Sequence, residues 1–189
     1  MNTIYNDLLI KEIKDALESV DFKNTRDSDT REVKNKLVKL ANKNNINVWT
    51  LINKNEDIDT NAHLANHEWL FDLIWYKYDK SHYSLTEIIL AMESEWGGRR
   101  YKSVNDNNDQ YGEVKYDFQK LLVCNSALKL MVFKIHGDNM ELEKLLQYFQ
   151  ERINNSKNTT PNEVFLFAYY HKDEKDKYKC KFIEMKKTI

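Results

Sequence analysis

The sequence predicts an α/β protein with a mixed central β-sheet flanked by helices. Two observations predict this class. Segments with apolar residues at helical spacing alternate along the chain with shorter runs rich in branched and aromatic residues. The composition, 41% hydrophobic and 12% aromatic, provides enough apolar side chains for a core.

The first half of the chain begins with two predicted amphipathic helices. Apolar residues recur at helical spacing over residues 4–20. A second helix is expected after residues 27–30, where Ser28, Asp29 or Thr30 can cap it, and the polar run 41–47 ends it. A short strand is predicted at 46–53, followed by a polar loop at 54–67.

The remaining elements follow from the same patterns. Residues 68–78 and 85–96 predict a hairpin, and 97–112 form a polar loop. A helix at 113–125, a strand at 127–135 and a helix at 139–153 come next. Strands at 163–171 and 178–185 are joined by a charged turn. No linker or repeat divides the chain, so we expect one domain over residues 1–189.

Charge and cysteine usage bound the functional classes. The chain has 29 basic and 30 acidic residues, so any nucleic-acid contact must use a local patch. Two cysteines far apart in sequence indicate reduced thiols rather than a disulfide framework. With no predicted signal peptide or membrane span, we expect a cytoplasmic protein without membrane contact.

The predicted hairpin carries a group of acidic residues. Side chains alternate between faces along a strand, so Glu93 and Glu95 share a face. A hairpin loop at 81–84 would pair Lys80 with Leu85 and place Asp72 opposite Glu93. The sequence therefore predicts three carboxylates in one patch.

Like charges opposed on a sheet destabilise it, so a cation, a shared proton or splayed side chains must relieve the repulsion. Mg²⁺ or Mn²⁺ suits carboxylate oxygens, and Mg²⁺ typically takes one or two carboxylates and keeps its waters. The alternative is that these glutamates simply face solvent. Asp72 lies within the aromatic run EWLFDLIWY, where a charge needs a partner, and this favours a functional cluster.

An Asp on one strand, E-x-E on the next, then a helix and a strand resemble the PD-(D/E)XK nuclease superfamily. The matching residues are Asp72 in LFDLI and Glu93-Ser94-Glu95 in MESEW, followed by DFQKLL (117–122) and LKLMVF (128–133). The resemblance covers about residues 28–135. It implies a restriction-endonuclease-like core (α-β-β-β-α-β), to which an N-terminal helix and, at 138–186, a helix plus hairpin are added.

The resemblance implies a divalent metal held by Asp72, Glu93 and the Ser94 carbonyl, and hydrolysis of a phosphodiester bond. Glu95 replaces the usual lysine and would accept a proton from water. Lys120, or Lys115, on the following helix could restore the missing positive charge, although a solvated helix lysine is the simpler interpretation. Gln119 resembles the polar residues that some members present from this helix. Glu32 could be the acidic residue that completes the family's site from an early helix, or an ordinary surface charge.

Other residues offer further hypotheses. Arg99, Arg100 and Lys102 follow the predicted site and could contact phosphates, or form an ordinary polar loop. His63 and His67 have a spacing seen in zinc sites but lack further ligands. Ser84, His82 and Asp79 crowd one turn without a nucleophile elbow. The four tryptophans are expected to fill the core.

The leading hypothesis is therefore a Mg²⁺-dependent nuclease acting on DNA or another nucleic acid. The alternative is a nuclease-fold domain that has lost its chemistry and acts as a binding or assembly module, which the missing lysine favours. Hydrolysis of a small phosphorylated metabolite is a weaker third hypothesis. A homodimer is compatible with this fold class by analogy alone.

Overall fold

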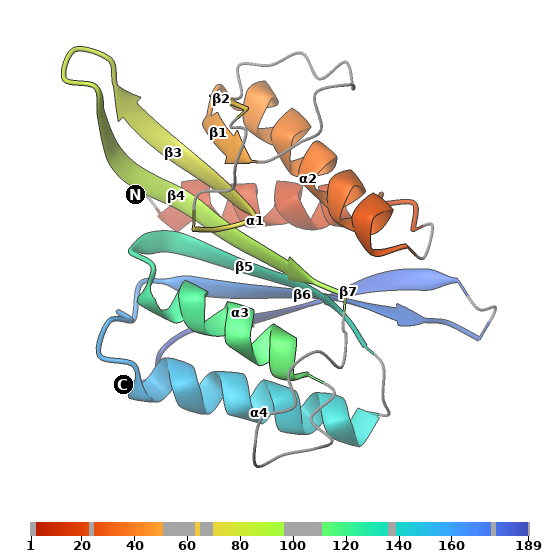
Figure 1. The fold of residues 1–189 in the computed structure, drawn as a ribbon. Coiled ribbons are helices and arrows are strands. Elements are labelled where there is room, and N and C mark those ends of the chain that lie inside the picture. Colours follow the sequence, from red (N-terminus) through yellow and green to blue (C-terminus); the bar gives the residue numbers. More distant parts are fainter. Residues whose placement is uncertain are drawn as a thin grey trace.

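The computed structural model describes residues 3–22, 25–50, 63–64, 70–96, 111–135, 139–174 and 177–188. A mixed β-sheet lies between two pairs of helices (Figure 1). Helices α1 (Thr3–Glu18) and α2 (Arg26–Lys43) cover one face, and α3 (Gly112–Val123) and α4 (Asn139–Asn155) cover the other. The predicted α/β class, with helices flanking a mixed sheet, is confirmed.

The strands of the described residues run in the order β2-β1-β3-β4-β5-β6-β7 across one sheet. Their bounds are β1 Asn47–Thr50, β2 His63–Leu64, β3 Leu73–Asp79, β4 Ser84–Glu95, β5 Ser126–Lys134, β6 Val164–Lys172 and β7 Tyr178–Met185. β1, β3 and β4 pair antiparallel in turn, whereas β4, β5 and β6 are parallel. The parallel strands therefore end at one edge of the sheet, which we call the carboxyl edge.

Several boundaries differ from the sequence-based prediction. Helix α2 begins at Arg26, with Thr25 as its N-cap residue, so the expected caps Ser28, Asp29 and Thr30 lie inside its first turns. Thr25 makes no side-chain capping bond. The segment expected to be a polar loop contains β2, which pairs in parallel with β1. A strand of two residues is too short to show the strand periodicity in the sequence.

The turn of the β3–β4 hairpin also differs from the prediction. Asp79 pairs with Ser84, so the loop comprises residues 80–83 rather than 81–84. Tyr83 adopts a left-handed conformation, with φ at 48°, and its side chain is exposed. Loop length alone therefore predicts the wrong strand register at the tip of this hairpin.

Two shifts in the pairing of β3 with β4 restore the predicted register near the other end of the hairpin. They lie between Trp75 and Tyr76 and between Lys77 and Tyr78. Beyond them, Leu73 pairs with Met92, which is the predicted alignment. Residue 72 consequently approaches β4 beside residue 93, as expected, although for a reason that the sequence did not reveal.

The core consists of two clusters separated by the sheet. One joins α1 and α2 to side chains that include Leu73, Met92 and Leu130. The other joins α3 and α4 to side chains that include Ile74, Ala91 and Met131. Because both faces of the central strands are buried, β5 and β6 have nearly continuous apolar sequences, and β4 carries the apolar run IILAM at 88–92.

Trp75 and Trp96 are buried in the α1–α2 cluster, which confirms the core role expected for them. Cys124 and Cys180 are both free thiols, as the spacing predicted. In the part of the chain described here, no helix combines the length and apolarity that crossing a membrane requires.

Candidate functional site

The predicted acidic residues of β4 lie at the carboxyl edge of the sheet. Glu93, Ser94 and Glu95 are the last three residues of the strand, and all three are buried. By strand alternation, Glu93 and Glu95 share the face of Ala91, which is covered by α3 and α4. Ser94 shares the opposite face with Met92, beneath α1 and α2.

Asp72 is positioned differently from the prediction. It precedes β3, in a bend, instead of lying within a strand. Its Oδ2 accepts hydrogen bonds from the Ser94 backbone N–H (2.8 Å) and the Ser94 hydroxyl (2.7 Å). Its Oδ1 lies 3.4 Å from Nζ of Lys34, a buried lysine of α2. The carboxylate therefore engages the α2 side of the sheet, because the chain bends before the strand pleat begins.

The predicted patch of three carboxylates on one face is thus wrong in its geometry. Asp72 contacts groups on the α2 side, whereas Glu93 engages α3. The two charges nevertheless influence each other. Burial, followed by the negative charge of Asp72, raises the pKa of Glu93 to about 8. The end of β4 is therefore flanked by two acidic groups that repel one another.

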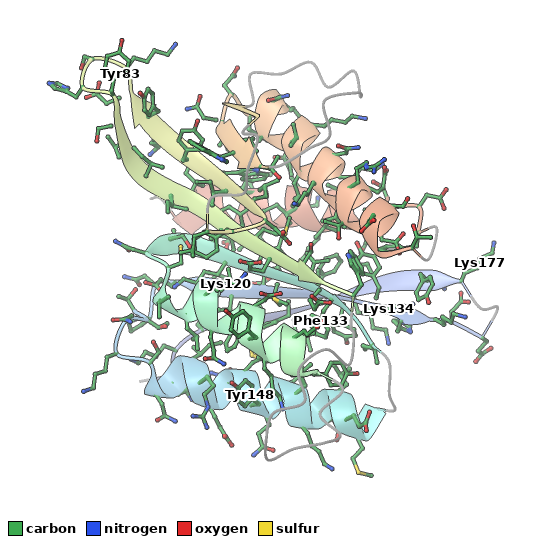
Figure 2. The ribbon with its side chains drawn as sticks, in the orientation of Figure 1. Tyr83, Lys120, Phe133, Lys134, Tyr148 and Lys177 are labelled. Carbon is green, nitrogen blue, oxygen red and sulfur yellow. The ribbon has the colours of Figure 1, made fainter. Side chains whose placement is uncertain are left out.

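Lys120, predicted from the helix that follows, reaches this strand end. Its Nζ lies 2.9 Å from Oε1 of Glu93 and 2.8 Å from Oδ1 of Asp117, one turn earlier on α3. Burial disfavours the charge of Lys120, but its hydrogen bonds to Asp117 and Glu93 outweigh this effect and raise its pKa. Lys120 therefore stays protonated at neutral pH. Figure 2 shows it on α3, facing the sheet.

Helix α3 adds two acidic groups that the sequence-based reasoning missed. Burial raises the pKa of Asp117, and the charges of Asp72 and Glu113 raise it further, against the effect of Lys120. Oε2 of Glu113 is buried without a hydrogen-bond partner among the described residues. The sequence could have indicated this group, since residues 113, 117 and 120 recur at the spacing of one helix face.

Lys34 is another residue of the site that the sequence analysis did not identify. Its position within the apolar stripe of α2 could have indicated a buried charge. Val33, Leu37 and Val38 are fully buried around it. A lysine at such a position needs an anionic partner, and here the partner is Asp72.

The weaker candidates lie elsewhere. Lys115 places its Nζ 5.0 Å from the ring centre of Tyr148 on α4. Gln119 is exposed on α3. Glu32 forms a 3.8 Å ion pair with Lys36, one turn along α2. Of the two lysines considered on α3, Lys120 is therefore the one that contacts Glu93.

The crowded turn of the β3–β4 hairpin is a local structure at the opposite edge. Asp79 accepts hydrogen bonds from the backbone N–H and hydroxyl of Ser81, and lies 2.8 Å from Nδ1 of His82. Hydrogen bonds from Ser81 and His82 lower the pKa of Asp79 to about 2. These bonds stabilise the turn, and Ser84 pairs with Asp79 as part of β4.

Some predicted residues lie outside the described part of the chain. Arg99, Arg100 and Lys102 belong to this group, as does His67, while β2 includes His63. Among the residues that are described, no three His, Cys, Asp or Glu side chains are grouped as potential metal ligands. The site supported by geometry therefore consists of the Asp72–Glu93 pair with Lys34, Asp117 and Lys120.

Comparisons with protein-family models, with curated proteins and with solved structures found no match to this chain.

Proposed function

We propose that this protein is a divalent-metal-dependent nuclease with a restriction-endonuclease-like core. The observation that carries the proposal is the contact of Lys120 with Glu93 at the strand end beside Asp72. In the resemblance to the PD-(D/E)XK superfamily, a lysine of β4 would supply a positive charge here. Lys120 supplies it from α3 instead, although β4 itself carries Glu95.

The order and pairing of the elements support the same proposal. Helix α2, strands β1, β3 and β4, helix α3 and strand β5 follow one another in the α-β-β-β-α-β order, with β2 inserted after β1. β1, β3 and β4 form an antiparallel meander, and β5 joins β4 in parallel. This arrangement supports the proposal, because the residue before β3 and the end of β4 lie at one end of the sheet and Lys120 of α3 contacts the latter.

The donor set fits a hard cation such as Mg²⁺ or Mn²⁺. Asp72 and Glu93 offer carboxylate oxygens, and the raised pKa of Glu93 reflects burial and repulsion that a cation would relieve. Two carboxylates suffice for Mg²⁺, which usually keeps several waters. Asp72, Glu93 and the Ser94 carbonyl would hold the ion once the Asp72 carboxylate turns from its contacts with Ser94 and Lys34 toward Glu93. When bound, such an ion acidifies water and polarises a phosphoryl oxygen.

The surrounding residues have distinct roles in this proposal. Without the ion, Ser94 and Lys34 hold the Asp72 carboxylate on the α2 side through three contacts. Asp117 holds Lys120 beside Glu93, where its charge can stabilise a phosphate that gains negative charge during the reaction. Glu95, buried on the same face of β4 as Glu93, is the proposed proton acceptor.

A second candidate function is supported by the same lysines. Lys34 already contacts Asp72, and Lys120 already contacts Glu93, so each acid has a cationic partner within the protein. A fold that neutralises its own acidic pair can be stable without a metal ion. The alternative is a nuclease-fold module that binds or assembles without catalysis.

Metal-dependent thermal stabilisation, measured together with cleavage of labelled DNA and RNA, tests the proposal. We expect Mg²⁺ or Mn²⁺ to raise the melting temperature of the wild type, and Asp72→Asn to abolish this rise. We expect Lys120→Met to lower cleavage by about 10²–10³-fold, the usual effect of losing a group that stabilises developing charge.

Two matched controls accompany these variants. Lys115→Met removes another lysine of α3, one that faces α4, and should leave cleavage near the wild-type rate. Glu87→Gln removes a half-buried carboxylate of β4 that pairs with Lys77 and should leave metal stabilisation intact. If metal ions leave the wild type unchanged, no substrate is cleaved and Asp72→Asn is less stable because buried Lys34 loses its anion, the non-catalytic alternative replaces the nuclease proposal.

A further inference from the structure

Another feature of the carboxyl edge is a pair of lysines held against one aromatic ring. Tyr178 is the first residue of β7. Nζ of Lys134 lies 4.7 Å from the centre of its ring, and Nζ of Lys172 lies 5.7 Å from it. Both distances are in the range of cation–π contacts. We call Lys134, Lys172 and Tyr178 the lysine–tyrosine cluster.

The cluster lies close to the acidic site along the sheet edge. Lys134 ends β5 and directly follows Phe133, which pairs with Glu95 of β4. Lys172 ends β6, the next strand. Neighbouring strands are about 4.8 Å apart, so the two lysines lie one and two strands from the end of β4. Figure 2 shows Lys134 where the β6–β7 hairpin leaves the sheet.

A group of packed aromatic rings connects the site to the cluster. Trp96 follows Glu95, and its ring lies 5.3 Å from that of Phe22, centre to centre. Phe22 in turn lies 5.7 Å from Tyr178. The indole N–H of Trp96 donates a hydrogen bond to Thr30 of α2. The position of the Tyr178 ring is therefore fixed by the same core that holds the end of β4.

The hairpin that carries the cluster has excess positive charge. Residues 172–181 contain five lysines and three acidic residues, in a chain whose overall charge is −1. Asp173 is engaged locally, because it accepts the Lys177 backbone N–H and lies 3.3 Å from Nζ of Lys179. The hairpin extends past the ends of β4 and β5, with Lys177 near its tip (Figures 1 and 2).

We propose that the lysine–tyrosine cluster binds the phosphodiester backbone of a nucleic acid and guides it along the carboxyl edge toward Asp72 and Glu93. Lysines held at fixed positions contact phosphates without regard to base sequence. The path of the nucleic acid toward Asp72 and Glu93 rests on the proposed nuclease function, whereas its binding at the cluster does not. By strand alternation both lysines lie on the α1–α2 side of the sheet, the side that Asp72 engages, so a phosphate beside Asp72 would have its neighbours within reach of Lys134 and then Lys172.

Fluorescence anisotropy with labelled single-stranded and duplex oligonucleotides, in a chelator that prevents cleavage, tests the proposal. We expect the double variant K134Q/K172Q to bind at least one of the two forms more weakly at low salt. Each lost phosphate contact reduces by about one the slope with which log affinity falls against log salt concentration. Between low and physiological salt, the fold loss of affinity should therefore be roughly tenfold smaller for the double variant than for the wild type. The form that shows this effect identifies the strandedness of the substrate.

The matched control is K80Q/K157Q, which removes two exposed lysines near the amino ends of β4 and β6. It changes the net charge equally and should keep the wild-type salt slope. Equal binding by the two double variants, or no binding by the wild type, overturns the proposed surface. Binding that depends on Lys134 and Lys172 without any cleavage in Mg²⁺ or Mn²⁺ overturns the nuclease function and leaves the surface intact.

Discussion

At the end of β4, a buried glutamate lies within hydrogen-bonding distance of a lysine from α3. Only 2% of the surface of Glu93 is exposed, so its charged form loses most of its hydration. The hydrogen bond from Lys120 offsets part of the resulting cost of ionising Glu93, whereas the negative charge of Asp72 increases that cost. A group so placed should make the stability of the fold depend on pH.

Replacing this glutamate tests that dependence. The pKa of Glu93 is about 8 in the folded protein and about 4.5 when unperturbed. The native state thus holds this proton more tightly, so its stabilising effect is complete below pH 4.5 and is lost as pH rises to 8. Relative to wild type, Glu93→Gln should gain up to about 4 kcal/mol of unfolding free energy between these limits.

Urea unfolding at pH 5 and pH 8 measures this difference. Glu87→Gln is the control, because Glu87 lies on the same strand but is only half-buried and is paired with Lys77. Its unfolding free energy should follow the wild type at both pH values. Parallel pH profiles for the wild type and Glu93→Gln would show that Glu93 is ionised in the native state throughout.

At the scale of elements, the parallel pairing of β5 and β6 encloses a buried ion pair. Lys129 is fully buried in β5 and pairs with Glu163, which directly precedes β6. Nζ of Lys129 also lies 4.7 Å from the ring centre of Phe165. A displaced register between these strands would separate the two charges in the core, so the pair favours the observed alignment.

Removing one partner of this pair should be costly. Lys129→Met leaves Glu163 buried without its cation, and we expect a loss of about 3–5 kcal/mol in unfolding free energy. The double variant K129M/E163Q removes both charges and should recover most of that loss. Urea unfolding of the three proteins measures both effects. Equal losses in the single and double variants would show that the ion pair does not determine stability here.

The elements differ in how far the sequence predicted them. Helices α3 and α4 and strands β5, β6 and β7 were predicted within two residues at each end, because each has a strong apolar period bounded by polar residues. The start of α2 was wrong, since several polar residues could each have capped it. The two irregularities of the β3–β4 hairpin depend on pairing between strands, which no local pattern encodes.

At the scale of the whole molecule, one sheet separates two apolar clusters. Ile13 of α1 belongs to the first cluster and Phe149 of α4 to the second, and both are fully buried. The central strands contribute side chains to both clusters. The two helical layers should therefore unfold together, although the two clusters share no side chain.

Conservative truncations on the two sides test this cooperativity. Ile13→Val and Phe149→Leu should each cost about 1 kcal/mol of unfolding free energy. Since the sites lie on opposite faces of the sheet, the double variant should lose the sum within about 0.5 kcal/mol. Thermal unfolding followed by tryptophan fluorescence and by circular dichroism should give coincident single transitions. Separate transitions would instead indicate that the layers unfold independently.

The sequence by itself determined the α/β class, the order of most elements along the chain and the identity of Asp72, Glu93 and Lys120 as candidates, because periodicity and isolated charges are local properties. The tertiary structure decided which charges meet. Asp72 engages Lys34 and Ser94 because the chain bends before β3, and Lys120 reaches Glu93 because α3 packs against the end of β4. Contacts of this kind join residues from 22 to 38 positions apart, and their geometry follows from packing rather than from local sequence.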